Sequence, residues 1–534
     1  DPEMSRGLGD VYKRQKQEVL DSYNRVKQLA TNVYGFLKAD FCSIDGAMLD
    51  AATDDAVHIY KSSNIQRFVD GTWSANNLVD NVWGHYYEGI RAANFYLKET
   101  AGLTFDEWKY SDDYEAIMKE FTNYQYEVRF LRAYFYFELI KRYRNIPFVL
   151  DVLAQNEANG VNPESYEKIA KFIVDECSDL AQILPVNYDN FSTKEKGRVT
   201  RAAAMALKSR VTLYMASPLF SEDSEDKWKQ AAEAAYDIIK QKTDLGLDLV
   251  PYPQIFNDVN NQKAEVILYR PTGESGDFEK ANFPIGVEGG KTSTCPTQNL
   301  MEAYDMKDGT PFVWNNQSNP YDNRDPRMKY TIVCNEMKWP VDPVEIWEGG
   351  TNGLPLQNAT TTGYYLKKYV NNTISFEAGS TVTKKQHNWV LFRYGEILLN
   401  YAEAMINAFH DPNYKDAVYN MSAREAVNQI RGRTNISLPG FPSDITEKDF
   451  VKRLKNERRV ELAFEGHRFW DVRRWKELGQ TANIYGVKIT KNNEVISYEK
   501  FLLETRAVTD NMYFYPIPNT ERFKNPNLGQ NPGW

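Results

Sequence analysis

The sequence predicts a mainly helical fold, in which paired helices form a scaffold and a loop-rich portion carries a few short strands. Apolar residues recur every three or four positions from about residue 17 to 240 and again from about 394 to 475, the spacing of amphipathic helices. Between 247 and 389 this spacing fades, and Pro, Gly, Asn and Thr crowd the chain. A chain of 534 residues can bury a large core without disulfides.

Residues 16–246 are expected to form an N-terminal helical region. Its predicted helices span 82–99, 130–143, 165–184, 200–215 and 228–240. Prolines close behind several of them stop the hydrogen-bond ladder: Pro147, Pro185 and Pro218. Residues 1–15 open with Asp1-Pro2-Glu3 and lack the pattern of a signal peptide, so they are expected to be a non-native or disordered leader.

Two neighbouring segments of this region resemble a tetratricopeptide repeat. Small and large apolar residues alternate in them as in two closely packed helices: Ala203, Ala206, Leu207, Val211 and Tyr214, then Trp228, Ala231, Ala235 and Ile238. Because the period is irregular and insertions separate the pairs, the pattern predicts a helical scaffold and not a regular solenoid.

Residues 247–534 are expected to form a second region that packs with the first as one compact unit. A loop-rich insertion at 247–389 contains candidate strands at 265–269 and 330–334. Helices are predicted at 394–405, 423–431 and 450–475, followed by an irregular tail at 476–534.

Composition excludes several classes of protein. The net charge of −9 does not attract a phosphate backbone, so no nucleic-acid partner is expected. No stretch reaches the ~18 to 20 apolar residues that span a bilayer. The four cysteines form no Cys-x-x-Cys pair, which leaves their redox state open.

The standard catalytic and cofactor motifs fail on spacing. None of the five histidines lies in a His-Glu-x-x-His pattern, and no Gly-x-Ser-x-Gly elbow occurs. Gly286 to Thr292 approaches a phosphate-binding loop, but three residues separate its glycines where that loop needs four. A pair of carboxylates for glycoside hydrolysis could be chosen anywhere, and nothing favours one pair. We therefore predict no catalytic residues, no metal and no cofactor.

The segment 456–475 carries the densest cluster of charge. Glu457, Glu461 and Glu465 are spaced by four residues, and such a row of like charges on one helix face needs cations. Arg458 and Arg468 lie within reach at helical spacing. Two interpretations remain, a substrate-binding Arg/Glu site and a partly buried structural ion network, and we favour the structural network.

The same segment is similar, almost residue for residue, to a family signature: Glu457-Arg-Arg-Val-Glu-Leu-Ala-Phe-Glu-Gly-His-Arg-Phe-Trp-Asp-Val-Arg-Arg-Trp475. Shorter matches are Ala52-Thr-Asp-Asp-Ala56, Trp83-x3-Tyr87-x2-Ile90-Arg-x2-Asn94, Pro296-Thr-Gln-Asn-Leu300, Arg324-Asp-Pro-Arg327, Gly363-Tyr-Tyr-x-x-Lys368-Tyr369, Arg393-Tyr-x-Glu-Ile-Leu-Leu-Asn-Tyr-Ala-Glu-Ala404 and Asn531-Pro-Gly-Trp534. From about residue 20 to 534 the chain resembles the SusD/RagB family of outer-membrane glycan-binding lipoproteins of Bacteroidota.

This resemblance implies a function as well as a fold. Helical pairs of tetratricopeptide type would form the scaffold, and the protein would bind an oligosaccharide or polysaccharide at the cell surface without cleaving it. Its partner would be a TonB-dependent outer-membrane transporter of SusC type. The resemblance also implies a lipid anchor on an N-terminal cysteine, a residue that does not occur before Cys42.

Sugar rings stack their apolar face on aromatic side chains, so the candidate glycan-binding residues are tryptophans in polar loops. Trp73 lies in such a loop with Asn76 and shortly after Asp54, in a part of the chain where members of the family often place ligand residues. Trp314 and Trp347 lie in the loop-rich insertion. Each could instead anchor its loop, while Trp470 sits on a helical face and is expected in the core.

Two other functions remain open from the sequence: an all-helical glycoside hydrolase, and a tetratricopeptide-type scaffold that binds proteins. The identity of the glycan is open as well.

Overall fold

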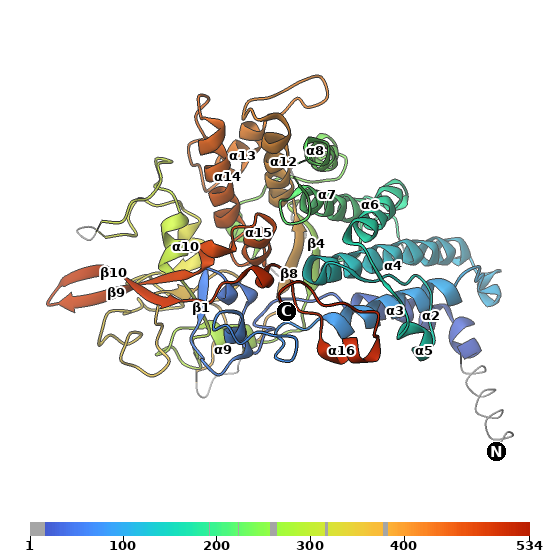
Figure 1. Cartoon of the computed structure of the whole chain (residues 1–534), viewed down its shortest axis with the longest axis horizontal. Coiled ribbons are helices and arrows are strands. Elements are labelled where there is room, and N and C mark those ends of the chain that lie inside the picture. Colours follow the sequence, from blue (N-terminus) through green and yellow to red (C-terminus); the bar gives the residue numbers. More distant parts are fainter. Residues whose placement is uncertain (1–15, 192, 223, 257–263, 316–318, 378–382) are drawn as a thin grey trace, which may run out of the picture. The chain divides into compact units, whose positions relative to one another are not determined.

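The computed structural model describes residues 16–191, 193–222, 224–256, 264–315, 319–377 and 383–534, so the predicted leader at 1–15 lies outside the described residues. The chain forms two compact units that alternate along the sequence (Figure 1). Among the described residues, the first unit comprises the chain from residue 16 to 38 and the segments 81–211 and 514–532, and the second comprises 39–80, 212–513 and 533–534. This division differs from the expected boundary at residue 246, because 39–80 and 514–532 each pack with a unit that is distant in sequence.

The first unit is a bundle of helices around α4 (Tyr114–Tyr143). The second half of α4 is buried on every side, and α2 (Tyr23–Tyr34), α3 (Trp83–Glu99) and α6 (Tyr166–Ile183) pack against it. Ser165 caps α6 by accepting a hydrogen bond from the amide of Lys168. The shorter elements of this unit are η3 (Asp106–Trp108), β2 (Ile146–Pro147), α5 (Gln155–Ala158), β3 (Pro163–Glu164) and α16 (Asn519–Lys524).

Helix α7 (Arg201–Ala216) begins in the first unit and ends in the second. In the second unit α12 (Tyr394–Phe409) is the central helix, buried along almost its whole length. It packs against α8 (Glu225–Lys240), α13 (Ala423–Arg431) and α14 (Glu447–Glu461). The predicted mainly helical fold with paired helices is confirmed.

The loop-rich parts of the second unit contain the predicted short strands and, in addition, short helices that were not predicted. These are η1 (Leu49–Ala52), β1 (Ala56–His58), η2 (Asn64–Phe68), η4 (Tyr252–Ile255), β4 (Val266–Pro271), α9 (Asp277–Asn282), β5 (Thr294–Pro296), α10 (Gln298–Ala303), α11 (Met328–Thr331), β6 (Ile332–Val333), β7 (Tyr365–Leu366), β8 (Asn388–Arg393), η5 (Leu478–Thr481) and η6 (Asp510–Tyr513). In the described part of the chain the strands pair as two-stranded antiparallel sheets, such as β1 with β5 and β4 with β8.

The tail predicted to be irregular contains a long hairpin, so that prediction is wrong for its first half. Strand β9 (Asn483–Asn492) pairs with β10 (Val495–Thr505) around a turn at Asn493, which adopts a positive φ of 54°. Asparagine tolerates this left-handed conformation better than most residues. The buried residues Ile484, Val487 and Ile489 hold β9 against the second unit.

The helix predicted at 450–475 is interrupted. Helix α14 ends at Glu461, and α15 (Arg468–Arg474) begins after a turn in which Phe464 and Gly466 have positive φ values of 59° and 74°. Left-handed residues cannot continue a right-handed helix. The turn therefore separates Glu465 from the helix that carries Glu457 and Glu461.

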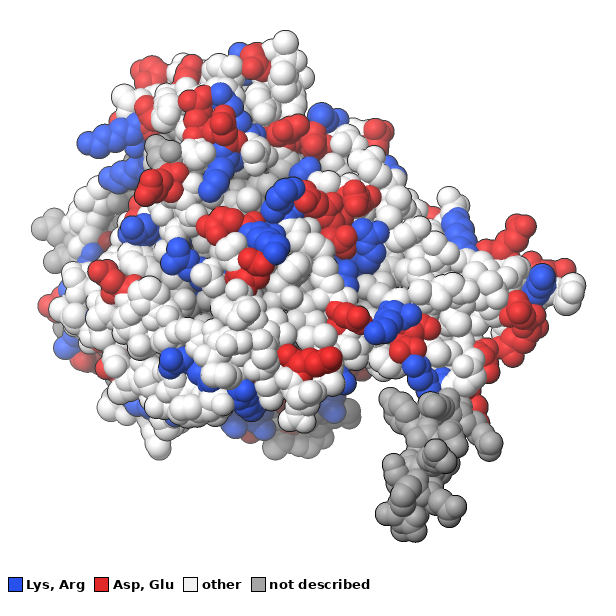
Figure 2. All heavy atoms as spheres, turned by 45° about the vertical axis from the view of Figure 1, so that its right-hand side comes forward, with Lys and Arg blue, Asp and Glu red and all other residues white. Residues whose placement is uncertain are grey.

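The surface carries no large field of one sign on the face seen in Figure 2, where acidic and basic side chains are interspersed. The four cysteines are free thiols, and three of them are buried: Cys177, Cys295 and Cys334. Their burial raises the pKa of each thiol, so they serve as small apolar core residues.

Gly363 joins the family-like motif at 363–369 to β9, and we predict that it tolerates no side chain. Gly363 and Gly349 both have a φ of +87°, but a Cβ on Gly363 would lie 2.5 Å from the carbonyl oxygen of Val487, whereas a Cβ on Gly349 would meet nothing within 4 Å. Gly349→Ala should cost about 1–2 kcal/mol of backbone strain, and Gly363→Ala should cost clearly more. Chemical denaturation measures the free energy of unfolding of both variants. Equal losses of stability would show that β9 can move away from the added methyl group at little cost.

Candidate functional site

Three glutamates, Glu457 and Glu461 of α14 and Glu465 of the turn after it, lie in the interior of the second unit and are paired with cations. Glu457 accepts hydrogen bonds from Arg327 at 2.6 Å and from Arg431 at 2.8 Å. Glu461 is completely buried, and its carboxylate accepts from three guanidinium groups: Arg327, Arg393 and Arg433. Glu465 accepts from the Nε of Arg393 at 2.7 Å and from Lys368 at 2.8 Å.

Together these groups form one continuous network that we call the central ion network. It contains six cations, Arg327, Lys368, Arg393, Arg431, Arg433 and Arg453, and six anions, Glu265, Asp305, Asp325, Glu457, Glu461 and Glu465. The equal numbers of cations and anions leave the network itself without net charge. A buried ion is tolerated only with such compensation and with its hydrogen bonds satisfied.

The electrostatics of Glu461 show how strongly the network favours its ionised form. Burial by itself would raise the pKa of this carboxyl, but the guanidinium groups of Arg433, Arg393 and Arg327 hold the pKa far below its usual value. Glu461 therefore stays charged throughout the physiological range.

The two arginines predicted to neutralise the glutamates have other partners, so that detail of the prediction is wrong. Arg458 donates to Asp471 at 2.8 Å, and Arg468 donates to Asp54 at 2.9 Å. Both belong to smaller balanced clusters: Arg458 and Arg474 with Glu403 and Asp471, and Arg459 and Arg468 with Asp54 and Asp55. The turn at Phe464 and Gly466 rotates Arg468 away from the face of α14.

Two of the predicted glycan-binding residues are buried and offer no surface to a ligand. Asp54 is 3% exposed, and its pKa is lowered to about 2 because Arg459 and Arg468 overcome the effect of burial. Trp73 is also 3% exposed, with its ring edge-on to Phe68 at 4.7 Å and to Trp534 at 4.8 Å. Trp73 therefore closes a small aromatic core, the loop-anchor alternative. Asn76, three residues further on, is exposed.

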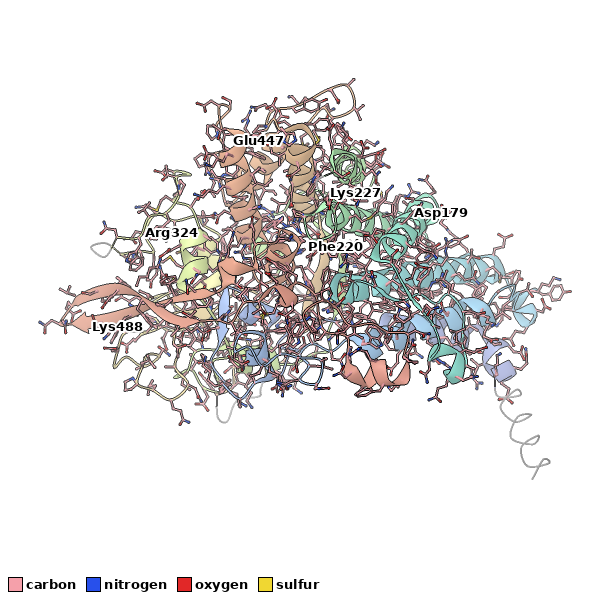
Figure 3. The ribbon with its side chains drawn as sticks, viewed as in Figure 1. Asp179, Phe220, Lys227, Arg324, Glu447 and Lys488 are labelled. Atoms are coloured by element: carbon pink, nitrogen blue, oxygen red, sulfur yellow. The ribbon has the colours of Figure 1, made fainter. Side chains whose placement is uncertain are left out.

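The largest hollow that we describe in the second unit runs along α14 and has a volume of about 890 Å³. We call it the α14 cleft. Its polar lining comes from α14, from the end of α10 and from η5, and includes Lys448, Lys452, Asn456, Arg459 and Gln480. Figure 3 shows Glu447 at the first turn of α14 and Arg324 beside α10. The volume is near the upper end of the ~300–1,000 Å³ typical of ligand sites.

An aromatic edge borders this cleft. Phe312 lines it. The half-buried ring of Trp314 is not part of the lining itself but lies 6.5 Å from the ring of Phe312, edge to face. The guanidinium of Arg324 stacks on Phe312 at 3.7 Å. The loop pattern in the sequence pointed to Trp314 but not to Phe312, although Pro311 before Phe312 marks the same exposed loop.

The central ion network fixes the loop that carries this edge. Arg453, which lines the cleft, donates to the carboxylate of Asp305 at 3.0 Å and to the carbonyl oxygen of Gly309 at 2.7 Å. Arg431 holds the same carboxylate at 3.0 Å and links it to Glu457. The loop thus begins at a residue of the network.

Trp347 lies apart from the cleft lining, in a half-buried position. The ammonium of Lys491, on β9, sits over its ring at 4.4 Å. A cation already occupies one face of this indole, which leaves less of it for a ligand.

The described residues give no sign of a metal centre, since no three His, Cys, Asp or Glu side chains among them are grouped to hold an ion. The acidic groups lining the cleft are largely engaged: Asp305 with Arg431 and Arg453, and Glu477 with Lys455.

We predict that Glu461→Gln destabilises the protein by about 3–5 kcal/mol, because it leaves three buried guanidinium groups short of one negative charge. Glu447→Gln, on the same helix, removes only an exposed contact with His410 and should cost less than about 1 kcal/mol. Thermal denaturation at neutral pH compares the two variants. Similar melting temperatures would mean that the network can release or rearrange its charges without cost.

We predict the opposite effect for Asp50, which lies in η1 and is 1% exposed. Neither carboxylate oxygen has a hydrogen-bond partner at ordinary distance among the described residues, and burial, with Asp55 and Asp40 nearby, raises its pKa well above the usual value. The folded protein holds this proton, whereas the unfolded chain releases it above about pH 4. Asp50 therefore costs stability increasingly as the pH rises above that value.

Asp50→Asn removes this cost, so the variant should melt above the parent at pH 8 and by a smaller margin at pH 5. The exposed Asp322→Asn is the matched control and should show no such pH dependence. A margin for Asp50→Asn that is equal at both pH values would contradict the assignment of a protonated Asp50.

Comparison with known proteins agrees with this architecture. The family model described as "SusD family" matches residues 255–534, and the one described as "Starch-binding associating with outer membrane" matches residues 10–213. A SusD-like protein of Formosa agariphila, P2, is 23% identical over 86% of this chain and 81% of its own length.

Solved structures show the same fold. A SusD-like protein from Bacteroides fragilis superposes with a TM-score of 0.79 at 25% identity, covering 96% of this chain and 98% of that one. A SusD-like carbohydrate-binding protein, also from Bacteroides fragilis, gives a TM-score of 0.76 at 24% identity, covering 96% of this chain and 100% of that one. With its signature helix, its paired-helix scaffold and a family match over more than half of its length, the chain belongs to the SusD family.

Proposed function

We propose that this protein binds an oligosaccharide or polysaccharide in the α14 cleft, without cleaving it, and passes it to a SusC-like TonB-dependent transporter of the outer membrane. The observation that carries the proposal is a cleft of about 890 Å³ whose polar lining is bordered by the aromatic edge of Phe312 and Trp314. The carbohydrate-binding description of a relative with the same fold supports it.

The chemistry of the cleft suits a sugar chain. The C–H face of a pyranose ring packs on an aromatic side chain, and its hydroxyls need donors and acceptors around the rim. Phe312 and Trp314 provide the first kind of contact. The polar lining provides hydrogen-bond donors and acceptors for the hydroxyls through the side chains of Lys448, Lys452, Asp444 and Gln480.

Rigidity of the aromatic edge favours binding, because a ligand then orders few side chains. Arg324 holds the ring of Phe312 from one side while donating hydrogen bonds to the carbonyl oxygens of Met301 at 2.6 Å and Tyr304 at 2.7 Å. Arg453 and Asp305 tie the start of the loop to the central ion network.

The proposed location is the outer membrane at the cell surface, in keeping with the family description of association with the outer membrane. Among the described residues no helix is both long and apolar enough to span a bilayer. A lipid anchor and the transporter partner are part of the proposal through membership of the family.

We predict that Trp314→Ala weakens binding to the preferred glycan by roughly 1–3 kcal/mol, the scale of losing one central aromatic contact, while the melting temperature stays nearly fixed. Phe312→Ala should have a similar effect on binding. The control is Trp347→Ala, which removes an indole of similar exposure outside the cleft. Calorimetric titration with the best ligand from a polysaccharide panel measures all three. Weaker binding by Trp347→Ala alone would move the site to the face near β9.

The same panel separates this function from its two alternatives. A non-catalytic binding protein should retain a polysaccharide and release no reducing sugar from it during prolonged incubation. Steady turnover abolished by one Asp or Glu substitution would identify a glycoside hydrolase. If the protein retains no glycan at all, a protein-binding scaffold becomes the better hypothesis.

A further inference from the structure

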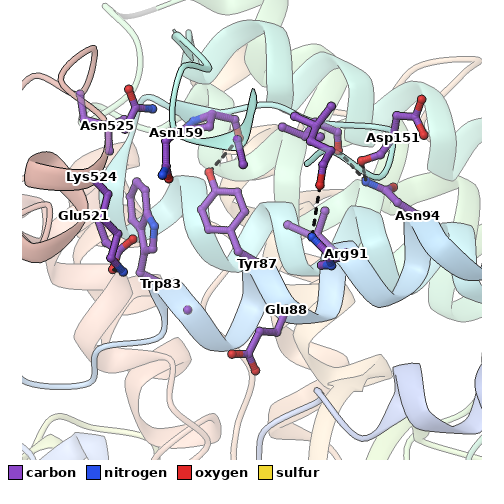
Figure 4. Close-up of a pocket in the computed structure, with 17 residues that line it drawn as sticks. Trp83, Tyr87, Glu88, Arg91, Asn94, Asp151, Asn159, Glu521, Lys524 and Asn525 are labelled. Carbon is purple, nitrogen blue, oxygen red and sulfur yellow. Dashed lines mark hydrogen bonds and ion pairs between the residues drawn. The ribbon is translucent and has the colours of Figure 1, made fainter. Parts of the chain in front are cut away.

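The first unit contains a separate pocket of about 340 Å³, built around one of the family-like motifs (Figure 4). The motif residues Trp83, Tyr87, Ile90, Arg91 and Asn94 all lie on α3 and all line it. The opposite wall comes from residues 147–159, and α16 with the residues after it supplies the third side.

Most polar groups of the motif hold the pocket wall in place. The hydroxyl of Tyr87 donates to the carbonyl oxygen of Pro147 at 2.7 Å, and Arg91 donates to that of Leu153 at 3.3 Å. The amide of Asn94 donates to two further carbonyl oxygens, those of Val149 and Asp151, both at 3.1 Å. These bonds, several of which Figure 4 draws as dashed lines, tie the segment 147–153 to α3.

One polar group of the motif, the indole N–H of Trp83, forms no hydrogen bond to the described residues of the pocket wall. The side chain of Trp83 contacts the rings of Tyr87 at 5.2 Å and Tyr143 at 5.0 Å, but its indole N–H donates to no group in the described part of the chain. Trp83 is 5% exposed and lines the pocket, where its indole stands beside Tyr87 in Figure 4. The indole nitrogen is not among the buried unpaired atoms of the described residues, so it is open to the pocket, where a ligand can accept its hydrogen bond.

The rim of the pocket indicates the class of ligand. Two of its charged groups are neutralised locally, Asp151 by Lys98 at 2.8 Å and Lys524 by Glu521 at 2.9 Å. The side chains of Glu88 and Asn159 make no hydrogen bond within the described ranges. In Figure 4 the amide of Asn159 lies on the same side of α3 as Trp83 and Tyr87, whereas Glu88 projects from the other side.

The apolar part of the lining comes from aliphatic side chains and the ring of Tyr87: Ile90, Pro147, Val149, Leu153 and Leu528. One sugar hydroxyl can accept from the indole N–H and another can bond to the amide of Asn159, and the carbon face of a sugar ring matches the aliphatic lining. A volume of about 340 Å³ is at the small end of the range for ligand sites.

We infer that this pocket is a second carbohydrate site, which takes one or two neutral sugar units and works separately from the α14 cleft. Trp83 and Asn159 bind ring hydroxyls, and the aliphatic wall covers the C–H face. The site rests on the first unit alone and does not depend on the function proposed for the cleft.

The test follows the indole N–H of Trp83 directly. Protein labelled with ¹⁵N at its tryptophan indoles is titrated with glucose, galactose, mannose, maltose, lactose and cellobiose, and the Trp83 signal is assigned by its loss in Trp83→Phe. At least one probe should shift this signal saturably, with a millimolar Kd. Asn159→Ala should weaken that binding by about tenfold, the effect of losing roughly one good hydrogen bond.

Asn156→Ala is the matched control, since Asn156 is exposed on α5 and lies outside the pocket lining. It should leave the titration unchanged, as should Trp314→Ala in the other unit. If none of the six sugars shifts the Trp83 signal saturably, or if the shift persists unaltered in both Asn159→Ala and the occluding Asn159→Trp, the inference is overturned. Retention of polysaccharide by the parent is scored separately, so failure here leaves the α14 cleft untouched.

Discussion

The second unit depends on burying a row of carboxylates without burying net charge. Glu457, Glu461 and Glu465 enter the interior because segments far apart in sequence each deliver a cation to them. Three of those cations, Arg327, Lys368 and Arg393, belong to short family-like motifs that lie far from α14 in the sequence. Removing any member would strand a charge, so the network constrains loops, strands and helices to one arrangement.

This constraint reaches the candidate site. Asp305 belongs to the central ion network and also opens the loop that ends in Phe312 and Trp314. The aromatic edge of the α14 cleft is thereby held by Asp305 and Arg453, which also line the cleft. Such support lets a loop present a fixed surface, which lowers the entropy lost when a flexible glycan binds. Part of the charged segment 456–475 also lines the cleft, through Asn456, Arg459 and Arg468.

In the first unit, hydrogen bonds hold neighbouring segments together in the way that ion pairs do in the second. Three residues of the α3 motif hold a neighbouring segment by its carbonyl oxygens, and the remaining indole N–H is left facing a pocket. The α3 motif thus both fixes one wall of the pocket and supplies a hydrogen-bond donor, Trp83, for a ligand within it. The α14 cleft and this pocket differ in volume, about 890 against 340 Å³, which suits ligands of different length.

The sequence by itself determined the helical class, most helix positions and the family, because hydrophobic periodicity and the signature at 457–475 are local properties of the chain. It also indicated that the charged segment is structural and that Trp314 lies in an exposed loop. Only the tertiary structure decided which charges pair, since Arg468 finds Asp54 across 414 residues. It likewise placed Trp73 in a small core against Trp534 and broke the helix at Phe464. The burial of a side chain and the partner of a charge depend on residues that are distant in sequence, so a local sequence pattern cannot predict them.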